Sequence, residues 1–218
     1  MKFENTEVWG FEHAIRGMRN PMESWDKSDS YYGNNEIGLE SYVIGENDMK
    51  LMKTLIKAGP EHRKFLRQIF ISVDITAPLY WWKEFYTYKV GTVADSCSTM
   101  HKLKDTPITV ECFEMGDFAD SNEENNNYNL YTKNMWSKLI DHLEALRKEF
   151  SETKDKRYWK ELVRLLPESW LQKRTVTMSY ENVANMYSQR MNHKLTEWSE
   201  DFIQWADSLP YFKELFTV

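Results

Sequence analysis

The spacing of apolar residues along the chain predicts helices and strands in an irregular order. In the segment 46–59, ENDMKLMKTLIKAG, the apolar side chains recur three or four positions apart, which is the pattern of an amphipathic helix. Asn47 or Asp48 stands where an N-cap is expected, and Gly59 stands where the helix should stop. This segment therefore predicts one complete helix.

A change of period follows this helix. Residues 65–78, FLRQIFISVDITAP, alternate apolar and polar positions and are rich in Ile, which predicts a strand ending at Pro78. The aromatic segment 78–90, PLYWWKEFYTYKV, can begin a helix with Pro78 in its first turn. The segment 106–115, TPITVECFEM, is a second candidate strand.

Helical spacing returns in the C-terminal half. It covers 130–150, LYTKNMWSKLIDHLEALRKEF, and the shorter segment 156–166, KRYWKELVRLL, which ends before Pro167. Residues 173–180, KRTVTMSY, have the composition of a strand. The remaining segment, 181–209, predicts one helix or two.

Two regions lack either period. Residues 1–45 are mixed, and within them we expect the segment 16–38 to form turns around Pro21, Gly33 and Gly38. We expect the acidic, Asn-rich segment 116–128 to form a solvated loop. Helices and strands thus follow one another without regular alternation, which favours an α+β fold. Because few Pro or Gly residues mark a boundary, we expect residues 1–218 to form a single domain.

Composition narrows the classes of function. A hydrophobic fraction of 41% supports a substantial core, and the net charge of -6 disfavours nonspecific binding to nucleic acid. Two cysteines provide neither a disulfide framework nor four zinc ligands, so we expect a reducing, cytoplasmic location. No apolar run approaches the roughly twenty residues that span a bilayer, and the N-terminus lacks the apolar segment of a secretory signal, so no membrane partner is expected.

Two common kinds of site are missing from the sequence. The five histidines are scattered, without a HExxH pair and without acids or cysteines at ligand spacing, so no metal is expected. Among the eight glycines there is neither GxGxxG nor GxxxxGK[ST]. Nucleotide binding of the Rossmann or P-loop type is therefore excluded.

The segment from Gly59 onward resembles the flavin-dependent thymidylate synthases. In that family a helix ending near Gly is followed by a strand, an "AP" step, an aromatic helix with Arg-Gln, and the motif RHRxxSxNExSxR. This chain has LIKAG, RQIFISVDI, TAPLYWWKEF and TYKVGTVADSCST in the same order. Aligned from Pro78 without a gap, Lys83 and Glu84 fall on Arg-Gln.

The motif itself aligns in position and differs in residue type. Thr87, Tyr88 and Lys89 fall on Arg-His-Arg, and Thr99 falls on the last Arg. Thr92 falls on the first Ser of the motif, and Cys97 falls on the second. Ala94 and Asp95 fall on Asn-Glu. None of these positions is identical to the motif. Those that keep a related chemical type are Lys89, Thr92, Asp95 and Cys97.

A later region extends the resemblance to about two thirds of the chain. The family has an Arg before an "LP" step, then a strand, then a helix whose Arg touches the pyrimidine. Here Arg164 precedes Pro167, KRTVTMSY follows, and Arg190 lies in the next predicted helix at the family's spacing. Arg164 is one residue closer to its proline than in the family.

The resemblance implies a thymidylate synthase-like fold, in which a mixed sheet packs against long helices, and a homotetramer that binds FAD and a pyrimidine nucleotide, dUMP. It also implies transfer of a one-carbon unit from a folate with hydride from reduced flavin, and NADPH as a candidate reductant. The implied catalytic residues are Arg190 and Cys97. The implied cofactor-binding residues are Thr87, Tyr88, Lys89 and Asp95. The implied substrate-binding residues are Lys83, Glu84, Ser98, Thr99, Arg164 and Arg190.

The departures from the motif remove cations. Thr87 and Thr99 replace guanidinium groups that the family uses for flavin and nucleotide, and each lost contact costs about 1.5 to 3 kcal/mol. The candidates for a compensating cation are Arg16, Arg19, Lys89, Lys102, Lys173 and Arg174. For Arg16 and Arg19 a surface salt bridge is the competing interpretation.

Cys97 suggests a second route to the same chemistry. A thiolate is the nucleophile that non-flavin pyrimidine methylases add to C6 of the ring, so Cys97 is a candidate nucleophile. The alternative is a small buried residue without chemistry, which is the commoner role of a free cysteine. The aromatic run has two interpretations as well: Trp81, Trp82 and Phe85 either stack on a flavin or base, or pack into the core.

Two classes of function therefore remain open. One is an enzyme, a divergent flavin-dependent thymidylate synthase or a relative that modifies another pyrimidine nucleotide. The other is a nucleotide-binding or structural protein that keeps the fold without flavin chemistry. Thr87, Tyr88 and Thr99 favour the second class, whereas Arg190 and Cys97 favour the first.

Overall fold

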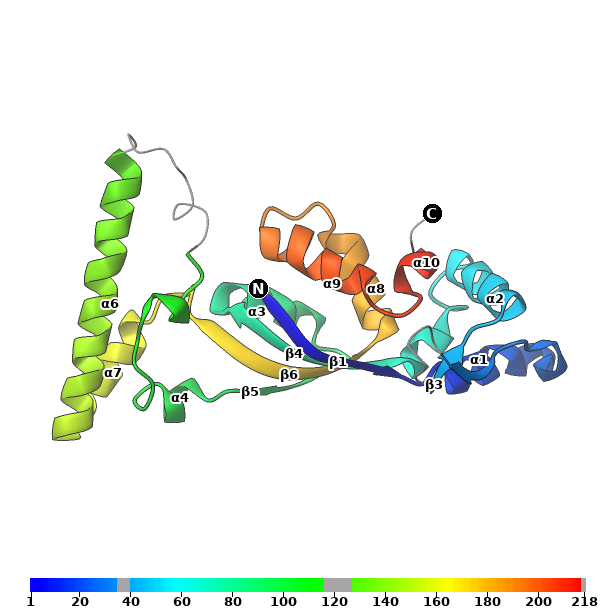
Figure 1. Cartoon of the computed structure of the whole chain (residues 1–218), viewed down its shortest axis with the longest axis horizontal. Helices are drawn as coiled ribbons and strands as arrows, with labels where there is room; N and C mark the ends of the chain where they lie inside the picture. The colour runs from blue at the N-terminus through cyan, green and yellow to red at the C-terminus, as the bar shows by residue number, and fades with distance from the viewer. Residues whose placement is uncertain (35–39, 116–126, 217–218) are drawn as a thin grey trace. The chain divides into compact units, whose positions relative to one another are not determined.

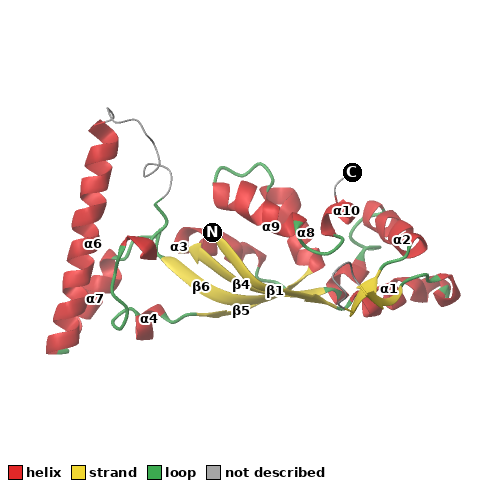
Figure 2. Cartoon of the chain, viewed as in Figure 1, coloured by secondary structure: helices red, strands yellow, loops and turns green. Residues whose placement is uncertain are grey.

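A four-stranded sheet runs through the structure in the order β1-β4-β6-β5. The coordinates are a computed structural model that describes residues 1–34, 40–115 and 127–216. The strands are drawn in yellow in Figure 2, and their bounds are β1 (Lys2–Trp9), β4 (Phe70–Pro78), β5 (Val93–Ser96) and β6 (Leu171–Ser179). A separate hairpin pairs β2 (Tyr31–Asn34) antiparallel to β3 (Glu40–Val43). The combination of these sheets with many helices confirms the α+β fold class.

The two long predicted strands form because their alternation matches a sheet with a buried face. In β4 the side chains of Ile71, Val73, Ile75 and Ala77 are each 0% exposed. Successive side chains of a strand point to opposite faces, so these four share one face of the sheet. The prediction of a strand ending at Pro78 is confirmed, and its first residues form a short 3-10 helix instead, η3 (Lys64–Gln68).

The helices follow the predicted segments closely (Figure 1). Those foreseen from the spacing are α2 (Glu46–Lys57), α3 (Leu79–Phe85), α6 (Asn127–Thr153), α7 (Lys156–Leu165) and α8 (Tyr180–Arg190). The segment after α8 is a further helical stretch that begins as a π-helix, η6 (Glu197–Phe202), and continues as α9 (Ile203–Asp207). Of the two alternatives for 181–209, the one with separate helices is confirmed.

The first 45 residues contain regular structure that the sequence did not predict. They include β1, the helix α1 (Phe11–Arg19) and the strands of the hairpin. Of the turns expected within 16–38, the one at Gly33 is wrong because Gly33 lies in β2, and Gly38 lies outside the described residues. β1 escapes the sequence pattern because its residues are mostly exposed and show no clean alternation of apolar and polar side chains. The acidic loop expected at 116–128 lies outside the described residues up to 126, and α6 begins at Asn127.

The candidate strand at 106–115 is not a strand. Its residues form a 3-10 turn, η5 (Val110–Cys112), and a single antiparallel bridge joins Phe113 to Trp170. The reason is tertiary: Ile108 and Phe113 are both buried in the apolar cluster around α6 and α7. Packing of these two side chains thus replaces a ladder of backbone hydrogen bonds.

Contacts between Cα atoms divide the chain into two compact units. Unit 1 consists of Met1, 75–87 and 95–174, and unit 2 consists of 2–74, 88–94 and 175–218. The expectation of one domain stays a prediction. Two further short helices are α4 (Thr99–Lys102) in unit 1 and α10 (Phe212–Phe216) in unit 2. No helix in the described ranges is both long and apolar enough to cross a bilayer.

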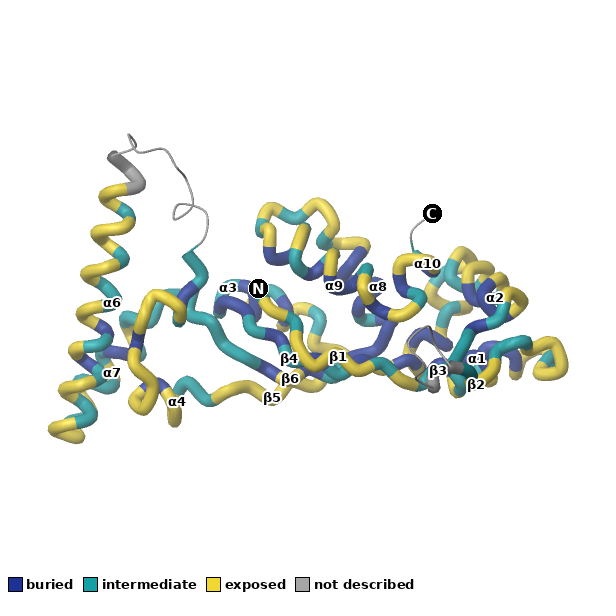
Figure 3. Tube along the Cα trace, in the orientation of Figure 1, coloured by how far each residue is buried: buried dark blue, intermediate teal, exposed yellow. Residues whose placement is uncertain are grey.

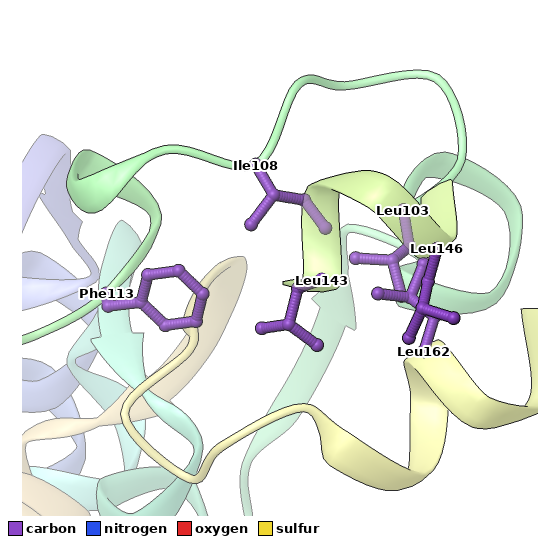
Figure 4. Packing of buried hydrophobic residues seen from close by; sticks show 6 residues of the cluster. All are labelled: Leu103, Ile108, Phe113, Leu143, Leu146 and Leu162. Atoms are coloured by element: carbon purple, nitrogen blue, oxygen red, sulfur yellow. The ribbon is translucent and has the colours of Figure 1, made fainter. Parts of the chain in front are cut away.

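Each unit has its own apolar core. In unit 1, α6 and α7 enclose a cluster whose members converge in Figure 4: Leu103, Ile108, Phe113, Leu143, Leu146 and Leu162. In unit 2, the ring of Tyr180 packs edge-on against Phe11 and Phe212 and is completely buried. Much of α6 is exposed and is yellow in Figure 3. Its exposed residues include the polar Lys138, Asp141 and Lys148 and, nearer its start, the apolar side chains of Leu130, Tyr131 and Met135.

The start of α2 corrects the predicted cap. The N-cap is Gly45, and the backbone N–H groups of Asn47 and Asp48 donate to the carboxylate of Asp29, at 2.9 and 3.1 Å. The side chain of Asp48 is fully buried and accepts hydrogen bonds from Arg19. The carboxylate of Asp29, far upstream in the sequence, therefore caps the helix. Asp48 pairs instead with the buried guanidinium of Arg19.

Candidate functional site

The predicted site residues are divided between the two units. Tyr88, Lys89 and Arg190 belong to unit 2. Unit 1 contains the others, namely Lys83, Glu84, Thr87, Asp95, Cys97, Ser98, Thr99 and Arg164. Convergence of Arg190 and Cys97 on one nucleotide therefore stays a prediction.

Arg190 is held by an aromatic cluster in unit 2. It is the last residue of α8, and its Nε donates to the hydroxyl of Tyr88 at 2.9 Å. Its guanidinium carbon lies 4.8 Å from the ring centroid of Trp198 and 5.3 Å from that of Tyr88. Two rings and one hydrogen bond thus fix the plane of the guanidinium. A planar cation fixed in this way is suited to a two-point contact with a carbonyl or a phosphate.

The residues around Tyr88 explain how a segment 102 positions away reaches Arg190. The capping box of α8, in which Ser179 and Asn182 bond each other's backbone, sets the start of the helix. Asn182 also donates from Nδ2 to the carbonyl of Val90 at 2.8 Å, and Gly91 permits the turn there with φ +80°. The turn after Tyr88 is thereby fastened to the first turn of the same helix that ends at Arg190.

The other positions that align with the Arg-His-Arg triplet lie at the surface. Thr87 is exposed, and its hydroxyl donates to the carbonyl of Glu84 at 2.7 Å. It therefore completes the end of α3 and offers no cation. Lys89 is exposed, and its ammonium forms no ion pair with any residue in the described part of the chain. Lys89 is available for an anionic group.

In unit 1, Cys97 lies on a segment held by its backbone. The N–H of Cys97 donates to the carbonyl of Lys173 at 2.9 Å, and its carbonyl accepts from Nε2 of Gln172 at 2.9 Å. The same amide nitrogen is 3.3 Å from Oγ1 of Thr99. The residue is exposed, so the burial assumed in the alternative interpretation is wrong, while a role for Cys97 in chemistry stays a prediction. A solvent-accessible thiol on a fixed backbone can act as a nucleophile.

Ser98 and Asp95 flank the cysteine in different ways. The side chain of Ser98 caps α4: its oxygen accepts from the backbone N–H of His101 at 3.2 Å and lies 2.8 Å from Nδ1 of that residue. Asp95 is exposed on β5. Their assignment to nucleotide or cofactor stays a prediction.

Two predicted substrate-binding cations are paired with carboxylates at the surface. Lys83 lies 2.6 Å from Glu168, and Arg164 lies 3.0 Å from Glu161 on the same helix. Exposed pairs of this kind contribute little to stability, about 0 to 1 kcal/mol. Either cation can therefore exchange its partner for a ligand, and both assignments stay predictions.

The tryptophans of the aromatic run belong to the core. Trp81, Trp82 and Phe85 are 0%, 1% and 3% exposed, and their rings pack against one another with centroids 4.9 to 5.4 Å apart. The packing interpretation is confirmed for these three residues. Tyr86, which follows them, is 53% exposed.

Among the candidate compensating cations, Arg19 is excluded. Its Nε donates to the buried carboxylate of Asp48 at 2.6 Å, and its other nitrogens donate to backbone carbonyls. The surface salt bridge that we considered for it is equally wrong, because Arg19 is only 4% exposed. Arg16 is exposed, with Nη2 3.4 Å from His13. Lys102 is also exposed, and Arg174 is buried.

Sequence reasoning missed Gln172, the residue that links β6 to the cysteine segment. Its amide bonds both Cys97 and Thr99, and its oxygen accepts from Arg174. Residues two apart share a face of a strand, so the strand period places Gln172 on the same face as Arg174. The sequence pattern predicted a strand only over 173–180, which excludes Gln172.

No family model matches the sequence, and no curated protein matches it. Solved structures do match over the whole chain. A crystal structure of the flavin-dependent thymidylate synthase ThyX from Helicobacter pylori complexed with FAD and dUMP is 18% identical, with a TM-score of 0.67, and the match covers 100% of this chain and 98% of that one. A second structure of ThyX from the same organism with FAD and dUMP, also 18% identical, has a TM-score of 0.66 and full coverage of both chains. This chain therefore has the fold of these thymidylate synthases.

Proposed function

We propose that the protein binds a pyrimidine nucleotide of the dUMP type together with FAD, and that it transfers a one-carbon unit to the nucleotide. The support for this proposal is the fold, which matches structures complexed with FAD and dUMP over the full length of the chain. In this proposal a folate donates the carbon, NADPH reduces the flavin, and the protein acts as a cytoplasmic homotetramer.

Two cations of unit 2 are assigned to the ligands. Arg190, with its plane fixed by Tyr88 and Trp198, would donate to the uracil carbonyls and stabilise charge that develops on the ring. Lys89, exposed and without an ion pair in the described ranges, fits the pyrophosphate of FAD as a point charge. When bound, FAD would supply the hydride that converts the transferred methylene into a methyl group.

A second candidate function is a nucleotide-binding or structural protein that lacks flavin chemistry. The observation in its favour is Thr87, which stands where the aligned motif has an arginine and whose hydroxyl donates to the carbonyl of Glu84 at the end of α3. Tyr88 likewise packs on Arg190 rather than offering a cation. Among the three residues aligned with Arg-His-Arg, only Lys89 is positively charged. The loss of the other cations lowers the affinity expected for FAD.

The two candidates differ in colour and in stabilisation by ligands. For the enzyme we expect purified protein to be yellow, to bleach with NADPH, and to melt at higher temperature with FAD or dUMP. A ligand at a hundred times its Kd adds about 2.7 kcal/mol to the free energy of unfolding. A colourless protein that added FAD does not stabilise, but that dUMP does, would support the second candidate, and indifference to both ligands would contradict nucleotide binding altogether.

We further propose Cys97 as a nucleophile. Its thiolate would donate an electron pair to C6 of the pyrimidine, forming an S–C6 bond while the C5–C6 π electrons give an enolate. C5 of that enolate would then attack the methylene carbon of the folate donor, and one of the two bonds from that carbon to folate nitrogens would break. Loss of the C5 proton to a base would expel the thiolate and restore the ring. Hydride delivered to the methylene carbon would break its remaining bond to nitrogen, which leaves a methyl group on C5 and releases tetrahydrofolate. The exposed thiol of Cys97 supports this role.

A fluorinated nucleotide tests this step. With fluorine at C5 there is no proton to lose after attack on the donor, so we expect 5-fluorodeoxyuridylate and the methylene-carrying folate to leave a covalent adduct visible by intact-mass spectrometry. Cys97→Ala should abolish the adduct. Cys112→Ala, at the other free cysteine, is the matched control and should retain it. An adduct on Cys97→Ala, or unchanged turnover in that variant, would rule out the nucleophile.

A further inference from the structure

Arg174, in β6, has a buried guanidinium without a carboxylate. The residue is 6% exposed. Its Nε and Nη2 donate to Oε1 of Gln172 at 3.1 and 2.8 Å, and its Nη1 donates to the hydroxyl of Tyr86 at 2.6 Å. None of these acceptors is charged, and no ion pair joins Arg174 to a carboxylate among the residues that the structure describes.

Two aromatic rings cover the guanidinium. Its carbon lies 4.1 Å from the ring centroid of Trp82 and 4.9 Å from that of Tyr86. Burial lowers the pKa of Arg174, and the neighbouring Tyr86 only partly offsets the effect. The rings and neutral oxygens therefore leave much of the cost of burying this charge uncompensated.

A second deeply buried arginine in the described ranges shows the contrast. Arg19 is 4% exposed and is paired with the carboxylate of Asp48 at 2.6 Å. Buried charges in proteins are ordinarily paired in this way. Arg174 departs from that rule. Binding of an anion from outside would therefore offset more of the cost of burying its charge than at an arginine that already has a carboxylate partner.

The surroundings of Arg174 connect it to the surface and to the candidate site. Tyr86, whose hydroxyl accepts from Nη1, is 53% exposed, so the guanidinium is hydrogen-bonded directly to a side chain that contacts solvent. Gln172 receives two N–H groups on its oxygen, which turns its amide nitrogen toward Cys97 and Thr99. The cation is thus one side chain away from the segment that aligns with the end of the family motif.

A guanidinium has five N–H groups, and three hydrogen bonds leave two in reserve. The hydroxyl of Tyr86 accepts from Arg174, so its own proton can be donated outward. The hydroxyl of Thr99 lies on the far side of Gln172. Several donors around one positive charge suit a phosphate group, which has several acceptor oxygens.

We propose that Arg174 is the cation that binds the phosphate of the nucleotide, in place of the motif arginines that Thr87 and Thr99 replace. This inference rests on the proposed function for the identity of the ligand, and it adds the residue that holds the phosphate. Gln172 and Trp82 position the guanidinium, and the hydroxyl of Tyr86 contributes a neutral donor beside it.

The competing role is structural: Arg174 would simply join Trp82, Tyr86 and Gln172. The two roles predict opposite effects of Arg174→Met, which removes the charge at similar length. If the charge is uncompensated, the variant should be as stable as the wild type or more stable without ligand. It should also weaken binding of dUMP about tenfold to a hundredfold. A structural guanidinium would instead lower the melting temperature and leave ligand binding unchanged.

The experiment measures melting temperature and Kd for the full chain with dUMP, deoxyuridine, FAD and inorganic phosphate at equal ionic strength. We expect Arg174→Met to lose affinity for dUMP and to bind deoxyuridine like the wild type. Arg67→Met, at an exposed arginine, is the control for loss of one positive charge and should behave as the wild type. A loss confined to FAD would place the flavin's phosphates, rather than the nucleotide's, on Arg174 and overturn the assignment.

The outcomes separate this inference from the proposed function. Equal binding of dUMP by the wild type and Arg174→Met overturns the role of Arg174 and leaves the function intact. Stabilisation by phosphate that depends on Arg174, without any by dUMP, supports the site and overturns the nucleotide. Indifference of the wild type to all four compounds overturns both. Should Arg174→Met not fold, Arg174→Lys takes its place with about tenfold weaker binding expected, and failure of both to fold would show a structural role.

Discussion

Replacing Arg190 by alanine should weaken binding of dUMP by about a hundredfold, the upper end of what one charge-assisted contact contributes. The guanidinium is already fixed against Tyr88 and Trp198, so little ordering is required when a ligand arrives. Arg190→Lys should retain part of the affinity, because an ammonium keeps the charge and loses the planar contact. Isothermal titration of each variant with dUMP measures both effects.

Tyr88→Phe tests whether the position of the guanidinium matters. This variant keeps the ring that faces Arg190 and removes the hydroxyl that accepts from Nε. We expect a loss of dUMP affinity of about tenfold or less, and a smaller loss than in Arg190→Ala. Arg67→Met again controls for net charge. Binding of dUMP by Arg190→Ala at wild-type affinity would remove Arg190 from the site.

Replacing Asp48 by alanine should lower the free energy of unfolding by about 3 to 5 kcal/mol, because it leaves the guanidinium of Arg19 buried without its partner. The side chain of Asp48 is 0% exposed. Besides Arg19, its carboxylate accepts from the hydroxyls of Ser28 and Ser30, each at 2.7 Å. Urea unfolding at neutral pH measures the change.

The same carboxylate predicts a dependence on pH. Burial by itself would raise the pKa of Asp48, but hydrogen bonds from Ser30, Ser28 and Arg19 outweigh it and lower the pKa below 3.8. A carboxylate with a lowered pKa contributes its stability in full above the unfolded-state pKa and loses it as the pH falls through the folded-state pKa. The difference between the wild type and Asp48→Ala should therefore be largest near neutral pH and shrink below about pH 4.

The exposed Asp105 provides the matched control for this substitution. Its carboxylate lies 3.9 Å from the ammonium of Lys104 at the surface. Asp105→Ala should change the free energy of unfolding by no more than about 0.5 kcal/mol. If Asp48→Ala is no less stable than Asp105→Ala, the carbonyls of Ser24 and Lys27 suffice to hold Arg19.

Much of the fold was readable from the sequence wherever one segment carries a sustained period. The spacing of apolar residues predicted α2, α7 and α8, and the alternation predicted β4. These periods arise because each helix or strand buries one face. The spacing of apolar residues within a single element therefore identifies its buried face. The order of these elements also sufficed for the resemblance to the thymidylate synthases, whose fold the chain shares.

Where an element depends on distant partners, the local pattern failed. β1 has mostly exposed residues and is a strand because it pairs in the sheet. The segment around Phe113 alternates like a strand but is drawn into the cluster of α6 and α7. Asp48 had the residue type and the position of an N-cap at the start of the helical period, whereas its carboxylate accepts hydrogen bonds from the buried Arg19.

For the site, the sequence by itself determined the candidates and their types: which cations the motif positions lack, and that Cys97 and Arg190 are present. Only the tertiary structure decided what surrounds each cation. It pairs Arg19 with the carboxylate of Asp48, places Tyr88 on Arg190 and buries Arg174 among neutral partners. The physical reason is that the energy of a charge depends on the groups within a few ångströms, and here those groups come from segments far apart along the chain.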